Sequence, residues 1–458
     1  MLIMNGLSVF VKSERKAGGM MTIHTVRSGD TIYSIARDYG VPPSRIITDN
    51  LLDNPGNLSV GQDLVILNPT VTHTVRGGET LYGIARAYNT DLLTLYRNNP
   101  ILGGEPNVYP GQILNIAYET PPLGEISSNG YAYPTIDRAV LRRTLPYLTY
   151  LSVFSYGIRP DGTLIEPAGG VDEVVALAKE YDTRPMPVLT SLSENGTFSS
   201  ELAAQVLADR DFADRVIASM AALVREKGYG GVDVDFEYIP AEYGEAYADF
   251  IRRMQEAVGE DIPVFVSLAP KYSADQPGLL YEGHRYRELG EAADQTLLMT
   301  YEWGYTYGPP LAVSPNREVR RVIEYGLTEI PPEKIFMGIP NYGYDWALPY
   351  VRGETMAQSL SNQAALERAE SRRAAIRYDD EAGAPFFTYY DRPESLQDAV
   401  EHVVWFENAR SSEALLRLVN EYGLRGAGVW NIMRYFPSLW NVMNALYTIR
   451  KEPLTESN

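Results

Sequence analysis

The chain contains the segment Gly230-Gly231-Val232-Asp233-Val234-Asp235-Phe236-Glu237-Tyr238, in which three carboxylates stand two residues apart. Alternate side chains of a β-strand point to opposite faces, so the three acids share one face and the apolar residues between them share the other. Such a strand fits a parallel βα barrel, whose outer face packs on helices while its inner face leads up to the active site. Because like charges this close cannot all ionise freely, at least one of the three pKa values is expected to be raised.

A carboxylic acid with a raised pKa beside an ionised carboxylate is the equipment of glycoside hydrolysis. The alternatives are a metal site and a charged strand end. The histidines His24, His73, His284 and His402 are scattered along the chain and none lies near the acidic strand, so zinc would lack nitrogen ligands there. Calcium or magnesium on three acids has no loop to support it. We therefore expect no metal and no cofactor.

Composition narrows the class of protein. The 458 residues are enough for more than one domain, and an apolar fraction of 45% allows a large core. The net charge of −19 argues against nucleic acid as a partner, and no apolar run is long enough to cross a membrane. The chain has no cysteine, so disulfides and thiol chemistry are excluded. We expect a monomer.

The first residues, 1–21, are interpreted as a disordered leader or an over-extended start. Their apolar run, Leu7–Val11, is too short for a secretory signal and leads into charged residues, so no signal peptide is expected.

A tandem repeat follows. The segment His24-Thr25-Val26-Arg27-Ser28-Gly29-Asp30-Thr31-Ile32-Tyr33-Ser34-Ile35-Ala36-Arg37 recurs as His73-Thr74-Val75-Arg76-Gly77-Gly78-Glu79-Thr80-Leu81-Tyr82-Gly83-Ile84-Ala85-Arg86. Each copy ends in Gly-Gln and an apolar strand, at Gly61–Ile66 and Gly111–Ile116. Self-similarity at this period indicates two copies of one small unit, which we interpret as a βααβ module spanning residues 22–69 and then 71–118.

Both copies resemble the LysM domain, a family that binds N-acetylglucosamine-containing glycans such as peptidoglycan and chitin. The resemblance implies a shallow groove between the first turn and the second helix, although turn chemistry alone could explain most of these residues. The groove residues would be Gly29, Asp30, Thr31 and Ile32 opposite Asn54 and Asn57, and Gly78, Glu79, Thr80 and Leu81 opposite Asn99 and Ile101. A Pro-stiffened linker is expected at residues 119–125.

From residue 126 to 450, apolar strand-like runs alternate with helical stretches, which predicts an α/β fold. Eight strands are expected, the count of a TIM (β/α)8 barrel. They are residues 130–133, 147–154, 186–190, 230–238, 262–268, 296–301, 335–340 and 426–430. The gap between the seventh and eighth strands is too long for one helix. It is interpreted as a small α+β insertion at about 344–410, with strand-like runs at 374–378, 385–389 and 402–406.

The acidic strand resembles the Asp-x-x-Asp-x-Asp-x-Glu signature of family 18 glycoside hydrolases, the chitinase-like barrels, except that Gly230 replaces the first Asp. Met299-Thr300-Tyr301-Glu302 resembles that family's Met-x-Tyr-Asp, with Glu302 in place of Asp. Ser191-Leu192-Ser193 stands where the family has Ser-x-Gly-Gly. The sequence from Gly338 to Gly343, which includes Asn341 and Tyr342, also resembles the pattern of this family. So does the strand that ends at Trp430.

The resemblance implies a retaining mechanism in which the 2-acetamido group of the substrate attacks its own anomeric carbon. Glu237 would be the general acid and base, Asp235 would orient the acetamido group, and Asp233 would share a proton with Asp235. The Tyr301 hydroxyl would hydrogen-bond the acetamido oxygen. Further candidates for binding substrate are Trp430, Tyr131, Glu302, Asn341 and Tyr342, with barrel packing as the alternative for Trp430.

Tandem LysM repeats before such a barrel are similar to the spore cortex-lytic N-acetylglucosaminidases of endospore formers, the SleL/YaaH type. The resemblance implies hydrolysis of N-acetylglucosamine linkages in peptidoglycan, with the spore cortex as the expected source, and a location at the spore coat, cortex or cell wall. Two alternatives remain, a chitinase or chitooligosaccharide hydrolase and a non-catalytic glycan-binding protein. Loss of Glu237 would indicate the latter, and Glu237 is present.

Overall fold

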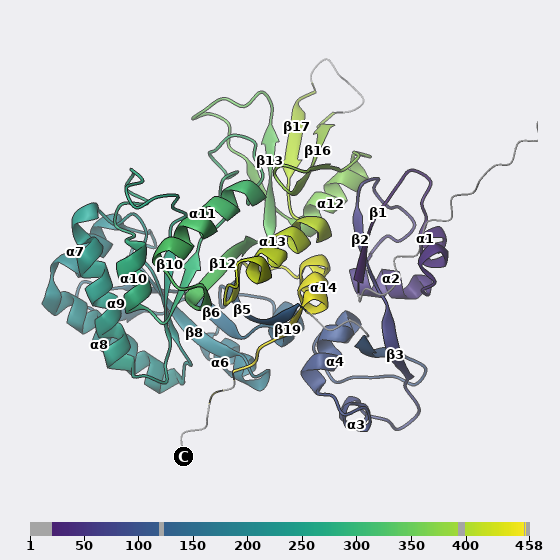
Figure 1. Cartoon of the computed structure of the whole chain (residues 1–458), viewed down its shortest axis with the longest axis horizontal. Helices are drawn as coiled ribbons and strands as arrows, with labels where there is room; N and C mark the ends of the chain where they lie inside the picture. Colours follow the sequence, from purple (N-terminus) through teal and green to yellow (C-terminus); the bar gives the residue numbers. More distant parts are fainter. Residues whose placement is uncertain (1–20, 119–122, 393–398, 453, 455–458) are drawn as a thin grey trace, which may run out of the picture.

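The computed structural model describes residues 21–118, 123–392, 399–452 and 454 (Figure 1). Residues 1–20 of the expected leader and 119–122 of the expected linker lie outside the described residues. Among the described residues, no helix combines the length and apolar character needed to cross a membrane.

Eight parallel strands close into a barrel, which confirms the predicted TIM barrel. Their order around the barrel follows the chain, and the first strand pairs with both the second and the eighth. The strands are β5 (Gly124–Ala132), β6 (Tyr150–Ile158), β8 (Arg184–Thr190), β9 (Val232–Asp235), β10 (Val264–Leu268), β11 (Gln295–Leu298), β12 (Ile335–Pro340) and β18 (Gly426–Trp430). Two short strands flank them, β7 (Leu164–Ile165) on β6 and β19 (Tyr447–Ile449) on β5.

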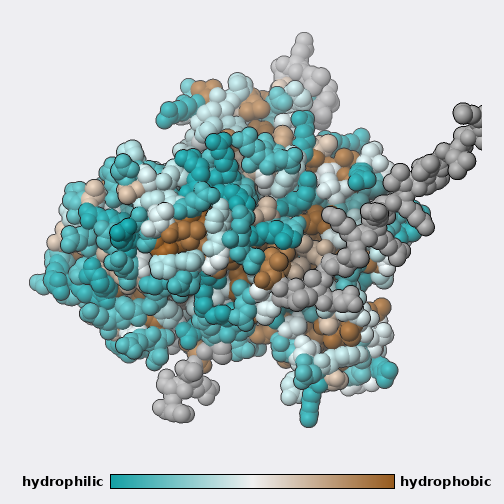
Figure 2. Space-filling view, in the orientation of Figure 1, coloured by the Kyte–Doolittle hydropathy of each residue, from teal (hydrophilic) through white to brown (hydrophobic). Residues whose placement is uncertain are grey.

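Helices cover the outside of the barrel (Figure 1). They are α5 (Arg138–Thr144), α6 (Val171–Glu180), α7 (Ser200–Ala208), α8 (Arg210–Lys227), α9 (Gly244–Val258), α10 (Tyr286–Ala292), α11 (Asn316–Glu329), α13 (Ala409–Glu421) and α14 (Pro437–Leu446), with 3-10 turns η2 (Leu145–Tyr147), η3 (Ala241–Tyr243) and η4 (Pro332–Lys334). The helical region between β8 and β9 is divided at Asp209, which takes an extended conformation and caps α8 by accepting from the backbone of Asp211 and Phe212. The outer surface over α7 and α8 is largely hydrophilic (Figure 2).

The acidic strand β9 alternates as its sequence predicts. Val232, Val234 and Phe236 are fully buried in the apolar cluster that joins the strands to the outer helices. Asp233 is equally buried but faces the barrel interior, where an inner cluster includes Tyr131, Phe265 and Phe336. The strand ends at Asp235, so Glu237 lies just beyond the carboxyl end of the strand, where βα barrels carry out their chemistry.

The insertion between the seventh and eighth barrel strands is a five-stranded antiparallel sheet with one helix, α12 (Asn362–Ser371). Its strands, in spatial order, are β14 (Gln358–Ser361), β13 (Tyr342–Ala347), β17 (Glu401–Trp405), β16 (Ala384–Tyr390) and β15 (Arg377–Asp379). The sequence predicted three of them and missed β13 and β14. Strand β13 begins one residue after β12 ends at Pro340, which is where the predicted seventh strand also ends.

The two repeats have the predicted βααβ form. Repeat 1 is built from β1 (Met21–Thr25), α1 (Ile32–Tyr39), α2 (Pro43–Asn50) and β2 (Asp63–Leu67). Repeat 2 is built from β3 (Pro69–Thr74), α3 (Leu81–Ala87), α4 (Leu92–Asn98), the 3-10 turn η1 (Pro100–Leu102) and β4 (Ile113–Tyr118). In each repeat the first and last strands pair antiparallel.

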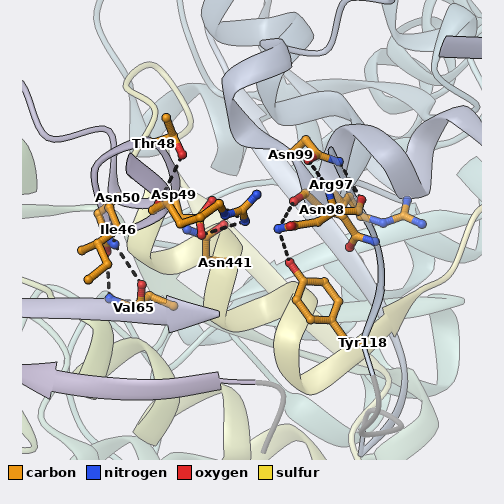
Figure 3. A network of polar contacts seen from close by, with 12 residues as sticks. Ile46, Thr48, Asp49, Asn50, Val65, Arg97, Asn98, Asn99, Tyr118 and Asn441 are labelled. Atoms are coloured by element: carbon orange, nitrogen blue, oxygen red, sulfur yellow. Dashed lines mark hydrogen bonds and ion pairs between the residues drawn. The ribbon is translucent and has the colours of Figure 1, made fainter. Parts of the chain in front are cut away.

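The repeats pack directly against the barrel (Figure 1). Helix α14 touches both: Asn441 Nδ2 donates to the Asp49 carbonyl at 2.6 Å (Figure 3). Asn444 Nδ2 donates to Asn98 Oδ1 at 3.1 Å. Arg97 of repeat 2 donates to the Pro146 carbonyl at 3.0 Å. The apolar core of repeat 2 is continuous with that of the barrel. Repeat 1 has a separate core, although Val65 and Leu67 of its strand β2 join the barrel cluster. The repeats are therefore held in one orientation relative to the barrel.

Candidate active site

The innermost acid, Asp233, is held by hydroxyl groups from neighbouring strands. Tyr131 of β5 donates to Asp233 Oδ2 at 2.7 Å, and Ser152 of β6 donates to the same oxygen at 3.1 Å. Burial raises the pKa of Asp233 to about 6, and the hydroxyls of Tyr131, Ser152 and Ser267 oppose that rise because they stabilise the carboxylate. Asp233 therefore changes its charge within the range where an enzyme works.

The two outer acids are also desolvated. Burial raises the pKa of Asp235 well above its usual value, and the charges of Glu237 and Asp233 add to the shift. Burial raises the pKa of Glu237 as well, and the second cause is the charge of Glu302. A raised pKa keeps Glu237 protonated at a pH where an exposed glutamate has lost its proton, which is the state that a general acid needs.

Tyr301 follows β11 and lies close to all of these carboxylates. Burial and the charges of Asp235, Glu237 and Asp233 raise its pKa well above 10, so its hydroxyl stays protonated and able to donate. Gly338 of β12 makes room for its ring, since a Cβ there would come within 2.7 Å of Tyr301 Cε1. The phenol and the acids are thus gathered at one end of the barrel.

Glu302 lies at the rim, in a left-handed backbone conformation with φ of 68°. Its carboxylate accepts hydrogen bonds from the hydroxyls of Tyr342 and, at 3.0 Å, Tyr344, both on β13 of the insertion. Although Glu302 is exposed, the groups around it partly desolvate its carboxyl and raise its pKa. The insertion therefore contributes one wall of the site.

A cleft of about 480 Å³ opens between the barrel mouth and the insertion, and of the acids described above Glu302 lines it, while Asp233, Asp235 and Glu237 do not. Four of the residues predicted to bind substrate line it: Glu302, Asn341, Tyr342 and Trp430. Asn341 Nδ2 donates to the carbonyls of Asn431 and Arg434 at 3.0 and 2.9 Å, so it holds the loop that follows Trp430. The remaining lining residues are Tyr344, Ser359, Leu360, Ser361, Ala364, Asn431 and Arg434.

Trp430 stands at the end of β18 among other aromatic rings. Its ring centre lies 4.8 Å from that of Phe154 and 5.7 Å from that of Tyr131. Tyr133, at 6.4 Å, is partly exposed beside it. Aromatic faces of this kind suit the apolar face of a sugar ring.

The structure brings together Asp233, Asp235, Glu237, Tyr301 and Glu302, each of which the sequence predicted as part of the site. It adds Ser152, Ser267, Phe154 and Tyr344, which the sequence analysis missed. Ser152 and Phe154 lie on the predicted second strand two residues apart, and that alternation was an available signal. Tyr344 lies on the missed strand β13, so nothing placed it near Glu302.

The predicted LysM turn residues have structural roles in both repeats. Asp30 accepts from the backbone of Arg27 at 2.7 Å and contacts His24. In repeat 2 Glu79 accepts from the backbone of Arg76 at 2.7 Å and contacts His73. Thr31 and Thr80 cap α1 and α3, and the preceding Gly29 and Gly78 take positive φ angles in the turn.

Three other predicted groove residues have buried side chains that a glycan would not reach. Ile32 and Leu81 lie in the module cores. Asn99 bonds the backbone of Leu95 and Asn115, as Asn50 bonds Ile46 and Val65 in repeat 1 (Figure 3). By contrast Ile101, Asn54 and Asn57 are exposed. The two asparagines contact Glu370 of the insertion.

Among the described residues, no group of three or more His, Asp or Glu side chains is arranged to hold a metal ion.

Comparisons with known proteins agree with this architecture. Residues 142–434 match the glycosyl hydrolases family 18, and residues 24–67 and 73–117 match the LysM domain. The chain is 38% identical over 439 residues to the cortical fragment-lytic enzyme of Bacillus subtilis (strain 168). The alignment covers 94% of this chain and 99% of that protein.

Two crystal structures match nearly the whole chain. The Bacillus cereus spore cortex-lytic enzyme SleL matches with a TM-score of 0.79 at 35% identity, covering 94% of this chain and 99% of that one. The Bacillus megaterium QM B1551 spore cortex-lytic enzyme SleL matches with a TM-score of 0.78 at 34% identity, covering 95% and 100%.

Proposed function

The chain belongs to family 18 of the glycosyl hydrolases and is a glycoside hydrolase with two LysM domains, and from that premise we propose that it cleaves N-acetylglucosamine linkages in peptidoglycan, chiefly of the spore cortex. Its relatives that carry the cortex-lytic name align over their full length, repeats included. The observation that carries the proposal is the desolvated row of Asp233, Asp235 and Glu237 at the barrel mouth, whose outermost member, Glu237, is influenced by the charge of Glu302 in the wall of the 480 Å³ cleft.

The chemistry follows from the protonation of that row. Glu237 donates its proton to the leaving glycosidic oxygen while the acetamido oxygen of the same sugar bonds to the anomeric carbon, giving an oxazolinium ion. Asp235 orients the acetamido N–H and balances the positive charge that develops on it. Water then attacks the anomeric carbon and opens the oxazolinium ring, while its proton passes to the Glu237 carboxylate and restores the enzyme. The product sugar keeps the configuration of the substrate at the anomeric carbon.

Asp233 and Asp235 titrate as a pair. Asp233 has hydroxyl donors on one oxygen, while its other oxygen and Asp235 Oδ1 are buried without a hydrogen-bond partner in the described part of the chain. A proton held between the two acids would give each of these two oxygens a hydrogen-bond partner. When that proton moves toward Asp233, Asp235 is left charged as the oxazolinium forms.

The neighbouring groups position the sugar. The protonated Tyr301 hydroxyl donates to the acetamido oxygen, and Trp430 lies under the sugar ring with Tyr131 behind it. Glu302, Asn341 and Tyr342 line the cleft on the insertion side and bind the glycan there. Glu302 is a supporting acid and does not become covalently attached.

The LysM repeats bind the same polymer and locate the enzyme at the cell wall or spore cortex. They carry no acid–base set of their own. Weak sites on one chain strengthen binding to a polymer through effective concentration. One chain contains both the catalytic groups and the repeats, so a monomer is sufficient for the proposed activity.

Product analysis by mass spectrometry tests the proposal. Cortex fragments, vegetative peptidoglycan and chitin are digested in parallel by the wild type and by Glu237→Gln, which should lose about 10²–10⁴-fold in turnover. The expected products carry N-acetylglucosamine at the new reducing end, most abundantly from cortex. A glucoside without the acetamido group should resist hydrolysis, and turnover of that glucoside at a comparable rate would refute substrate assistance. No hydrolysis of any glycan by the wild type would leave only a glycan-binding protein.

A further inference from the structure

The loop that follows the eighth barrel strand carries an arginine, Arg434, which lines the cleft between the barrel mouth and the insertion. Its side chain is exposed, and it follows Trp430 closely in the chain. Two of the residues that line the cleft are charged, the acid Glu302 and the base Arg434. The catalytic steps make no use of the Arg434 guanidinium.

This guanidinium has no acidic partner within the described part of the chain. Its Nη1 donates to the adjacent Met433 carbonyl at 3.4 Å, which is longer than a usual N–H···O bond. Glu302, the acid of the same cleft, accepts instead from the hydroxyls of Tyr342 and Tyr344 on the insertion. A guanidinium carries five N–H donors in a planar fork that matches a carboxylate. Arg434 therefore has donors available for a ligand in the cleft.

The backbone that carries Arg434 is held in place by buried amides. Asn341, which is 4% exposed, donates through Nδ2 to the carbonyls of Arg434 and Asn431 at 2.9 and 3.0 Å. Asn362, also buried, donates to Asn341 Oδ1 at 3.4 Å and accepts from the backbone of Glu407 at 2.9 Å. Because the loop is already fixed at this point, less conformational entropy is lost when the guanidinium binds a ligand.

The two charged residues belong to different walls of the cleft. Glu302 follows β11, and its charge acts on Glu237, so it stands toward the catalytic acids. Arg434 stands on the loop that leaves β18 after Trp430, the ring on which a sugar would lie. Since Trp430 and Arg434 line one cleft, an oligosaccharide bound there would meet both the aromatic ring and the guanidinium.

We propose that Arg434 binds a carboxylate carried by a sugar of the glycan, and that this ion pair distinguishes peptidoglycan from an uncharged polymer such as chitin. Peptidoglycan alternates N-acetylglucosamine with a sugar whose lactyl ether bears a carboxyl group, either free or extended by a peptide with carboxylates of its own. A guanidinium holds such a group through two parallel hydrogen bonds. The identity of the polymer rests on the proposed function, whereas the preference for an anion rests on Arg434 itself.

The test compares two tetrasaccharides of the alternating glycan, one with free lactyl carboxyl groups and one with the same groups converted to amides. The ratio of kcat/KM for the acid to that for the amide is measured in the wild type and in Arg434→Gln. We expect the ratio to fall about five- to tenfold in the variant, chiefly through KM, because an exposed charge pair is weaker than a buried one. Arg434→Lys keeps the charge without the planar fork and should lose less.

Arg225→Gln is the matched control. Arg225 is an exposed arginine of the outer helix α8 that does not line the cleft, so the change removes the same charge and should leave the ratio unaltered. Added salt should lower the ratio in the wild type toward that of Arg434→Gln, because salt screens exposed charges. An equal ratio in the wild type and Arg434→Gln would overturn the assignment, as would an equal loss on the acid and the amide.

A third tetrasaccharide, with peptides on its lactyl groups, identifies the source of the carboxylate. Dependence on Arg434 with the free acid assigns the lactyl carboxylate, and dependence only with the peptide-bearing fragment assigns the peptide. Both results support a carboxylate site.

Calorimetric titration of the acid and amide fragments into the full chain with Glu237→Gln separates this site from the proposed activity. If the wild type hydrolysed neither fragment, yet Arg434→Gln in the Glu237→Gln protein weakened binding of the acid alone, the proposed function would fall and the anion site would stand. Hydrolysis of the peptidoglycan fragments with the same ratio in both proteins would keep the function and overturn the site.

Discussion

Tyr131 and Asp233 are joined across the barrel by a hydrogen bond of 2.7 Å, although their strands, β5 and β9, are not neighbours in the sheet. The phenol stays protonated because burial and the adjacent carboxylate raise its pKa well above 10. It therefore always donates, and it favours the charged form of Asp233. Burial still wins and leaves the pKa of Asp233 at about 6.

Tyr131→Phe removes that donor and should raise the pKa of Asp233 further. A hydrogen bond to a charged group contributes about 1.5–3 kcal/mol, and about 1.4 kcal/mol corresponds to one pKa unit. The acid pair must lose a proton for activity, so the acidic limb of the profile of kcat/KM against pH should move up by about one unit. Tyr156→Phe is the control, since that buried hydroxyl of β6 contacts Tyr229 and no acid. An unmoved acidic limb in Tyr131→Phe would contradict this assignment.

Glu302→Gln should lower the pKa of Glu237, because the charge of Glu302 helps to raise it. Glu237 acts as a general acid only while protonated, so activity is present below its pKa and is lost as the pH rises through it. The basic limb should therefore move to lower pH, with the maximum rate reduced by about tenfold or less since the amide oxygen still accepts from Tyr342. The profile of kcat/KM against pH measures both the position of the basic limb and the height of the maximum.

The same variant distinguishes a covalent mechanism. If Glu302 were the nucleophile, Glu302→Gln would lose nearly all activity, and a fluorosugar would form a trapped adduct on Glu302 detectable by mass spectrometry.

The barrel and the acid row could be predicted from the sequence because each depends on local periodicity. Asp233, Asp235 and Glu237 alternate with apolar residues over one strand, and the repeats match each other residue by residue. Strand β13 could not be found in this way, because its register depends on pairing with β17, about sixty residues further along. Tyr344 and its bond to Glu302 were missed for that reason.

The docking of the repeats could not be predicted either. The sequence pointed to a Pro-rich linker between two bodies, and the contacts that hold them together join residues far apart in the chain. Asn441 and Asp49 are 392 positions apart, and Asn408 and Asp63 are 345 apart. Nothing in the local pattern around Asp63 distinguishes a buried interdomain acid from a surface one.

Arg410→Ala tests that docking. Asp63 is buried on repeat 1, and Arg410 of α13 is the cation that faces it. Removing the guanidinium leaves the acid with the hydroxyl of Thr25, the amide of Asn408 and the backbone N–H of residue 410. Arg410 is itself one-third exposed, so we expect a loss of about 1–3 kcal/mol in the free energy of unfolding, less than for a fully buried pair.

Thermal and denaturant unfolding measure this loss. Arg417→Ala, which breaks an exposed pair with Glu413 on the same helix, should cost about 0.5 kcal/mol or less. Equal costs for the two variants would mean that the Asp63 contact does not hold repeat 1 in place.

Glu407 makes the stability of the protein depend on pH. It lies immediately before α13 with its side chain 3% exposed, and neither carboxyl oxygen accepts a hydrogen bond of normal geometry among the described residues. Burial raises its pKa from 4.5 to about 8, with only the nearby Ser411 hydroxyl opposing the shift. The folded chain therefore keeps this proton between pH 4.5 and about 8, while the unfolded chain releases it. The contribution of this proton to the free energy of unfolding is fully present below pH 4.5. It falls by about 1.4 kcal/mol per pH unit as the pH rises to about 8.

Glu407→Gln resembles the protonated acid at every pH and should remove this slope. We expect the variant to match the wild type near pH 4.5 and to exceed its free energy of unfolding by about 3 kcal/mol at pH 7. Urea unfolding followed between pH 4.5 and 8.5 gives the slope for each protein. The control is Glu413→Gln, because Glu413 is a partly exposed acid paired with Arg417 on the same helix, and this change should leave the wild-type slope unchanged. A Glu407→Gln variant that kept the full wild-type slope would show that Glu407 titrates normally in the folded protein and that the pH dependence arises elsewhere.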